Sequence, residues 1–133
     1  MAKAKSKAVA INGQDLFEAK ATEILDRVCD ELDLGWLSVR QRFNEHPSAD
    51  GADTIAETAP QWEYRIATII WNVEVGVSQT DEQIERVVIH ELVHALMSPL
   101  WSELSAAQQN KLTKQNELAT ENITRAIQAA RRR

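Results

Sequence analysis

The sequence predicts an α+β domain in which an N-terminal helix, a small antiparallel sheet and two further helices follow one another along the chain. Apolar residues recur every three or four positions in segments 12–34, 81–97 and 102–130, as they do on the buried face of a helix. Segments 36–43 and 61–75 instead alternate apolar and polar residues, as half-buried strands do. A chain of 133 residues has room for one hydrophobic core, so we expect a single domain.

The first predicted element is an amphipathic helix from Asn12 or Gly13 to Leu34. Charged residues separate its apolar positions, which are Phe17, Ala21, Ile24, Leu25, Val28 and Leu32. Asn12 is a suitable N-cap, because its short side chain can accept a hydrogen bond from the first turn. Gly35 stands where the helix is expected to end, since glycine readily adopts the backbone conformation that follows a last turn.

The two predicted strands are separated by a long loop. In 36–43 polar and apolar residues alternate, whereas in 61–75 β-branched and aromatic residues dominate, which makes the second strand the stronger prediction. The stretch 44–60 contains proline, glycine and many polar residues, the composition of a loop. We therefore expect the two strands to pair antiparallel, as a hairpin across this loop.

The helix predicted at 81–97 has both a start and a stop signal. Thr80 and Gln83 have the spacing of a capping box, in which each side chain bonds to the backbone of the other residue. Pro99 is expected to end the helix near residue 97, because proline lacks the N–H that helical bonding requires.

The last predicted helix is the longest. It begins near Ser102 or Ser105, either of which can cap its first turn, and continues to about Ala130. A break is expected near residues 110–113. Residues 131–133 are three arginines, which we expect to form a frayed, solvated C-terminal end.

Charge, hydropathy and cysteine content narrow the classes of function. Residues 1–10 are expected to be a disordered basic tail, ahead of a domain at 11–130. The two ends hold six of the fifteen basic residues, so nine remain in the body against twenty acidic ones. Such a body repels nucleic acid, which leaves only the basic ends to contact it.

Hydropathy and cysteine content indicate the compartment. No apolar run is long enough for a membrane span or suited to a signal peptide. Cys29 is the only cysteine, so no internal disulfide can form, and we expect a cytoplasmic protein.

The clearest functional motif in the sequence is His-Glu-Leu-Val-His at residues 90–94. Two histidines four apart on a helix lie on one face, so His90 and His94 can bind one metal ion together. Glu91 projects from the same region, where it can act as a base on a water molecule at that metal. The alternative to a metal site is a helix on which two histidines lie four residues apart by chance. Uncharged flanking residues, as on a helix buried in a domain, favour the metal site.

A durable catalytic zinc site needs a third protein ligand. The last helix offers Glu117 and Glu121, which lie one turn apart and can face the same site. In such an arrangement one carboxylate binds the metal and the other accepts the remaining N–H of a ligating histidine. The alternative is that both carboxylates belong to a solvated acidic face.

This pattern resembles the gluzincin metallopeptidases, whose H-E-x-x-H helix is followed by a second helix with N-E-x-x-S-D. The matching residues here are Asn116, Glu117, Thr120 and Glu121. The chain is similar to the minimal, single-domain members often carried by phages, in which a strand like Ala67-Thr68-Ile69-Ile70 precedes the zinc helix. The resemblance spans roughly residues 36–128. It implies a Zn²⁺ ion held by His90, His94 and Glu117, with Glu121 as the acceptor of a histidine N–H or as the alternative third ligand.

The chain departs from the gluzincin pattern at two points. Glu121 stands where the family has aspartate, and its longer side chain could exchange roles with Glu117. The second lobe of the larger enzymes is absent, which removes their transition-state-stabilising residues and most of the cleft.

The expected function is zinc-dependent hydrolysis of a peptide bond, with Glu91 as general base and a protein or peptide as substrate. The peptide is expected to add a strand to an exposed sheet edge, for which 64–72 is the candidate. Tyr64, His46 and Arg65 are candidates for stabilising the oxyanion. Two alternatives are a zinc-binding but catalytically silent regulatory or assembly domain, and a purely structural helical domain. The sequence does not indicate an oligomeric state.

Overall fold

The computed structural model describes residues 13–45 and 54–132. Their helices and strands are, in chain order, α2 (Gly13–Glu31), β1 (Ser38–Asn44), β2 (Ala56–Gln61), the 3₁₀ turn η1 (Trp62–Tyr64), β3 (Ile66–Asn72), α3 (Val73–Gly76), α4 (Asp81–Trp101) and α5 (Ala106–Arg131). The predicted α+β class is confirmed, with the long helix at the C-terminal end. Three earlier predictions, on the tail 1–10, the cap Asn12 and the loop residue His46, lie outside the described residues.

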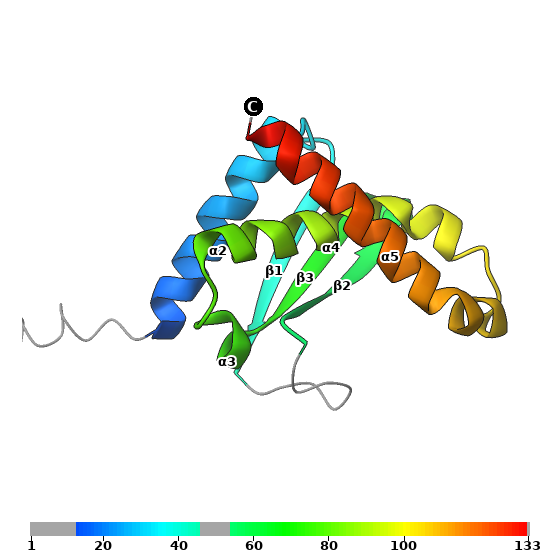
Figure 1. Ribbon diagram of the computed structural model, residues 1–133, viewed down its shortest axis with the longest axis horizontal. Coiled ribbons are helices and arrows are strands. Elements are labelled where there is room, and N and C mark those ends of the chain that lie inside the picture. The colour runs from blue at the N-terminus through cyan, green and yellow to red at the C-terminus, as the bar shows by residue number, and fades with distance from the viewer. Residues whose placement is uncertain (1–12, 46–53, 133) are drawn as a thin grey trace, which may run out of the picture.

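The helix α4 organises the domain. It crosses one face of the sheet between α2 and α5 (Figure 1), and it contacts both helices as well as β2 and β3. Beneath it, Phe17 packs edge-on against Trp71 and Phe43, with ring centroids 5.3 and 5.9 Å apart. Gly76 is needed beside this cluster, because a Cβ there would lie 2.7 and 2.8 Å from the Cε atoms of Phe17. α4 is thus packed between two helices and the sheet, and its buried residues belong to the same hydrophobic core as this cluster.

The sheet is mixed, so the predicted antiparallel hairpin is wrong. The strand order is β1-β3-β2, with β1 parallel to β3 and β2 antiparallel to it. All of strand β2 except its last residue, Gln61, lies within the predicted loop 44–60. Neighbouring strands joined by a tight turn run antiparallel, whereas parallel strands need a longer crossover. The connection between β1 and β3, which includes β2, provides that crossover.

The composition of β2 explains why it was missed. Its sequence, Ala-Glu-Thr-Ala-Pro-Gln, has a single β-branched residue, Thr58, and includes Pro60, which cannot donate to a ladder. Proline is tolerated here because β2 is an edge strand. The strongly apolar β3 lies in the centre of the sheet, where Ile69 and Trp71 are fully buried. The predicted use of 64–72 as the substrate-accepting edge is therefore wrong.

The helix α2 ends at Glu31, before the predicted stop at Gly35. Its last turn closes in a Schellman-type arrangement, in which the Leu34 N–H donates to the Cys29 carbonyl at 2.9 Å. The left-handed residue of this arrangement is Asp33, with φ of 55°. Aspartate tolerates that conformation better than most residues, so the glycine is not needed to end the helix.

The helix α4 begins as predicted and ends later. The capping box is confirmed, since the Gln83 N–H donates to Thr80 Oγ1 at 3.2 Å and the Thr80 N–H donates to Gln83 Oε1 at 2.9 Å. The helix continues through Pro99 to Trp101. The Ser98 hydroxyl donates to the Ala95 carbonyl at 2.6 Å, which is the acceptor that the missing proline N–H would otherwise leave open. The Ser98 side chain thus supplies the Ala95 carbonyl with the hydrogen bond that Pro99 cannot donate.

The helix α5 starts after a second capping box, formed by Ser105 and Gln108, and runs without the break expected near 110–113. Its predicted frayed end is partly wrong. The Arg131 side chain is 10% exposed and pairs with Glu31 at 2.6 Å and Glu85 at 2.5 Å, which ties α5 to α2 and α4. Within the described ranges, no helix is long and apolar enough to cross a bilayer.

Candidate metal centre

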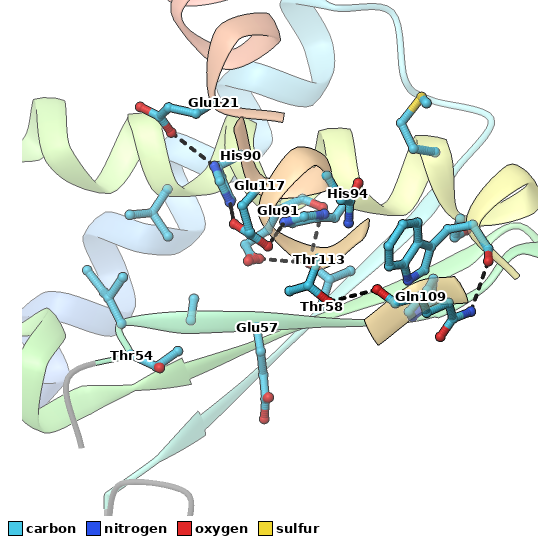
Figure 2. A pocket seen from close by; sticks show the side chains of 18 of the residues that line it. Thr54, Glu57, Thr58, His90, Glu91, His94, Gln109, Thr113, Glu117 and Glu121 are labelled. Atoms are coloured by element: carbon cyan, nitrogen blue, oxygen red, sulfur yellow. Dashed lines mark hydrogen bonds and ion pairs between the residues drawn. The ribbon is translucent and has the colours of Figure 1, made fainter. Parts of the chain in front are cut away.

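A cavity of about 900 Å³ lies between β2, α4 and α5 (Figure 2). Residues from all three segments line it: Thr54, Ile55, Ala56, Glu57, Thr58 and Pro60; then Arg86, Val87, His90, Glu91, His94, Met97, Ser98 and Trp101; and finally Ala106, Gln109, Asn110, Thr113, Asn116, Glu117 and Glu121. Both predicted histidines and all three predicted acidic residues face this one space. The fold thus brings together residues from two helices that are distant in sequence.

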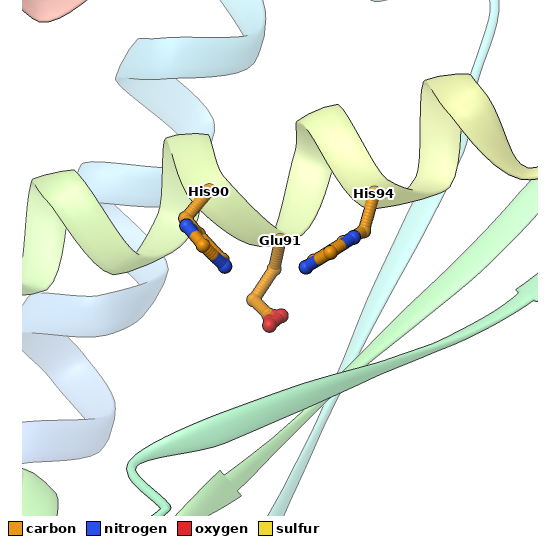
Figure 3. Close-up of side chains that lie close together, drawn as sticks. All are labelled: His90, Glu91 and His94. Carbon is orange, nitrogen blue, oxygen red and sulfur yellow. The ribbon is translucent and has the colours of Figure 1, made fainter. Parts of the chain in front are cut away.

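The histidines and the intervening glutamate project from successive turns of α4 toward the cavity (Figure 3). The imidazole rings of His90 and His94 lie 4.8 Å apart, nearly at right angles, and each side chain is about one-fifth exposed. Ligand atoms of His90, Glu91 and His94 all lie within 4.8 Å of one another. This group could hold a metal ion.

Glu117 of α5 joins the two histidines. Its Oε2 lies 3.2 Å from Nε2 of His90, and its Oε1 lies 3.0 Å from Nε2 of His94. One carboxylate therefore contacts the same nitrogen of both rings. The side chain of Glu117 is 54% exposed, so this side of the group is open to the cavity.

Glu121, one turn further along α5, contacts the opposite side of the His90 ring. Its Oε2 lies 3.2 Å from Nδ1 of His90, while its Oε1 contacts the guanidinium groups of Arg86 and Arg125. With the proton on Nδ1 donated to Glu121, the Nε2 lone pair of His90 points toward Glu117 and the cavity. Burial lowers the pKa of His90; the neighbouring His94 and Arg86 add to this, and Glu117 opposes it. The net direction favours the neutral ring, which is the form that binds a metal.

Glu91 is the most deeply buried of the three acidic residues around the histidine pair. Glu91 is 5% exposed and accepts a hydrogen bond from the Thr58 hydroxyl at 2.9 Å. Desolvation by burial raises the pKa of Glu91 from 4.5 to about 8; the Thr58 hydrogen bond opposes this, and the negative charges of Glu117 and Glu57 add to it. A buried carboxyl group with a raised pKa in a cavity marks Glu91 as a candidate functional residue.

The contribution of Glu91 to the stability of the metal-free protein is expected to fall as pH rises from about 5 to 8. The folded state holds the Glu91 proton more tightly than the unfolded chain, so this group's contribution is largest below the unfolded pKa. It declines by up to about 1.4 kcal/mol per pH unit as pH rises toward the folded pKa. Urea unfolding at several pH values measures the decline.

Glu91→Gln is the control for this pH dependence, because glutamine keeps the shape without the titrating proton. The lowered pKa of His90 makes stability rise with pH in both proteins, so the difference between them isolates Glu91. We expect the variant to be more stable than the natural protein at pH 8. Equal slopes in the two proteins would contradict the assignment.

Two of the three candidates for oxyanion stabilisation lie in the described residues, and both lie away from the cavity lining. Tyr64 lies in η1 and its side chain is 75% exposed. Arg65 follows it at φ of 56°, where it forms the left-handed end of that turn. Neither residue is among those that line the cavity. His46 lies outside the described residues.

Two residues of the site were not identified from the sequence. Thr58 lies in the unpredicted strand β2, and no local signal connects it to Glu91. Arg86 precedes His90 by one helical turn, so helical spacing alone could have placed it on the same face. Its contact with Glu121 depends on how α5 packs against α4, and the sequence of neither helix alone predicts that packing.

Comparisons of the chain with protein-family models, with curated proteins and with solved structures found no match.

Proposed function

We propose that this chain is a zinc-dependent metallopeptidase of the minimal gluzincin kind, in which His90, His94 and Glu117 hold the metal and Glu91 is the general base. The observation that carries the proposal is the contact of one Glu117 carboxylate with Nε2 of both histidines. The carboxylate oxygens and imidazole nitrogens converge on one point at the cavity wall, beside the buried Glu91.

The donor set suits zinc. Zinc is commonly bound by two histidines and one glutamate in catalytic sites, which keep a fourth position open. The exposure of Glu117 toward the cavity supports such an open position. The contact between Nδ1 of His90 and Glu121 also suits a ligand whose orientation is fixed by a neighbouring carboxylate.

Bound zinc would supply a Lewis acid that polarises a peptide carbonyl and lowers the pKa of water. Among the protein's own side chains, Glu91 transfers the proton. Its carboxylate takes a proton from the attacking water and later returns it to the leaving amine. The position of Glu91 suits this role, because its carboxylate lies beside both histidines and is held by the Thr58 hydroxyl.

A peptide substrate would lie along β2 rather than along the strand first expected. β2 is the edge strand beside α4, and four of its residues line the cavity: Ala56, Glu57, Thr58 and Pro60. An extended peptide could pair with the unpaired backbone groups of this edge and cross in front of the histidines.

Elemental analysis combined with a cleavage assay tests the proposal. The purified protein should contain about one zinc ion per chain and cleave an unstructured protein such as casein. A chelator should stop the cleavage, and added zinc should restore it. Protein without zinc, or cleavage that chelation leaves unchanged, would rule the proposal out. Zinc binding without cleavage would favour the alternative of a silent regulatory or assembly domain.

A further inference from the structure

Thr58 lines the cavity and also belongs to the free edge of the sheet. The Asn72 N–H donates to the Ile55 carbonyl at 2.8 Å, at the start of the antiparallel pairing between β2 and β3. Bonded and non-bonded positions alternate in such a pair, so Glu57 bonds to β3 while Thr58 directs its N–H and carbonyl to the free edge. The side chain of Thr58, opposite Ile69 in the register, points toward α4.

The Thr58 hydroxyl has one proton and two acceptors within reach. Oε2 of Glu91 lies 2.9 Å from Oγ1, and the Glu91 main-chain carbonyl lies 3.1 Å away. That carbonyl belongs to the interior of α4, where helical bonding already supplies a donor. The ionised Glu91 carboxylate is a stronger acceptor than a main-chain carbonyl, so the Thr58 hydroxyl donates mainly to the carboxylate.

The hydrogen bond decides how the Glu91 side chain is oriented. Among the described residues, Thr58 provides the one side-chain hydrogen bond to this carboxylate. Because the hydroxyl engages Oε2, Oε1 is the oxygen left to exchange a proton with a reacting molecule. Without the hydroxyl, rotation about the last side-chain bonds would spread the carboxylate over several orientations.

We propose that Thr58 is the positioning residue of Glu91, and that it links the strand on which a peptide pairs to the base that acts on that peptide. The inference rests on the proposed function. The backbone N–H and carbonyl of Thr58 would hold the substrate, and its hydroxyl would orient the Glu91 carboxylate. One residue would thus position both the peptide and the base. Misplacement of a base by as little as 1 Å can cost about 10²-fold in rate, so one hydroxyl can have a large effect.

The test compares Thr58→Val, which keeps the β-branched shape without the hydroxyl, with Thr58→Ser, which keeps the hydroxyl. Valine should lower kcat by about 10–100-fold with KM and zinc content unchanged, and serine should retain most of the activity. Crystal structures of the metal-free proteins give a readout independent of activity. The Glu91 carboxylate should hold one orientation in the natural protein and the serine variant, and several in the valine variant.

The outcomes separate this inference from the proposed function. An active natural protein whose valine variant has unchanged kcat would overturn the positioning role alone. Equal losses in the valine and serine variants, or a raised KM at constant kcat, would also overturn it, in favour of strand packing or substrate contact. If the natural protein cleaves nothing, the proposed function fails. The Glu91 orientation in the metal-free variants would still show whether Thr58 holds that carboxylate.

Discussion

Replacing Glu91 with glutamine is expected to lower kcat for peptide hydrolysis by about 10²–10⁴-fold, with zinc still bound. The Glu91 carboxylate lies beside the two histidines but takes its own hydrogen bond from Thr58. We therefore expect it to move a proton rather than to hold the metal. Glutamine fills the same space and accepts the same hydrogen bond, but it cannot accept a proton from water. Steady-state hydrolysis of a peptide and elemental analysis of the variant measure the two effects.

Glu57→Gln is the matched control for this substitution. Glu57 is an exposed acidic residue of β2 that lines the same cavity, yet no contact joins it to the histidines in the described structure. Its replacement should change kcat by no more than a few-fold. The proposal for Glu91 does not survive if Glu91→Gln hydrolyses peptides at the natural rate, or if it loses zinc to the same extent as activity.

Unfolding cannot account for the expected loss of activity. The buried Glu91 carboxylate costs the metal-free fold stability at neutral pH, because burial raises its pKa to about 8. Glutamine removes that cost. A variant that is more stable and much less active is the pattern of a site where function opposes folding.

The site was predictable where helical periodicity determines position. His90 and His94 are four apart, as are Glu117 and Glu121, and each pair must share a helix face wherever the helix forms. The capping box at Thr80 marked where the first of these helices begins. The contact between the two helix faces depends on tertiary packing, and it was inferred from the chemistry that a metal requires.

The edge strand was not predictable from local signals. β2 has neither alternation of apolar residues nor many β-branched ones, and Pro60 argues against a strand. Its pairing with β3 stabilises it, and that pairing is a non-local interaction. Thr58 was missed for this reason. Pro99 illustrates the same limit, because the hydroxyl of Ser98 overrides the rule that proline ends a helix.

Replacing Glu117 with alanine is expected to leave the protein without zinc at ordinary metal concentrations. The substitution removes the carboxylate that contacts Nε2 of both histidines, and it leaves a site with two imidazoles. Glu121→Ala should instead retain zinc with about 10–100-fold weaker affinity, the range for loss of a residue that orients a ligand. Competition with a chromogenic chelator measures both affinities.

Asn116→Ala is the control for the zinc-affinity experiment, since Asn116 adjoins Glu117 on α5 and lines the same cavity. It should bind zinc like the natural protein. The structure gives a reason for the ranking of the two glutamates. Glu121 contacts Nδ1 of His90 and also pairs with Arg86 and Arg125, whereas the ion-pair contacts of Glu117 in the described structure are to the two imidazole rings. The reverse ranking, with zinc lost from Glu121→Ala and kept by Glu117→Ala, would make Glu121 the ligand and Nδ1 of His90 the coordinating atom.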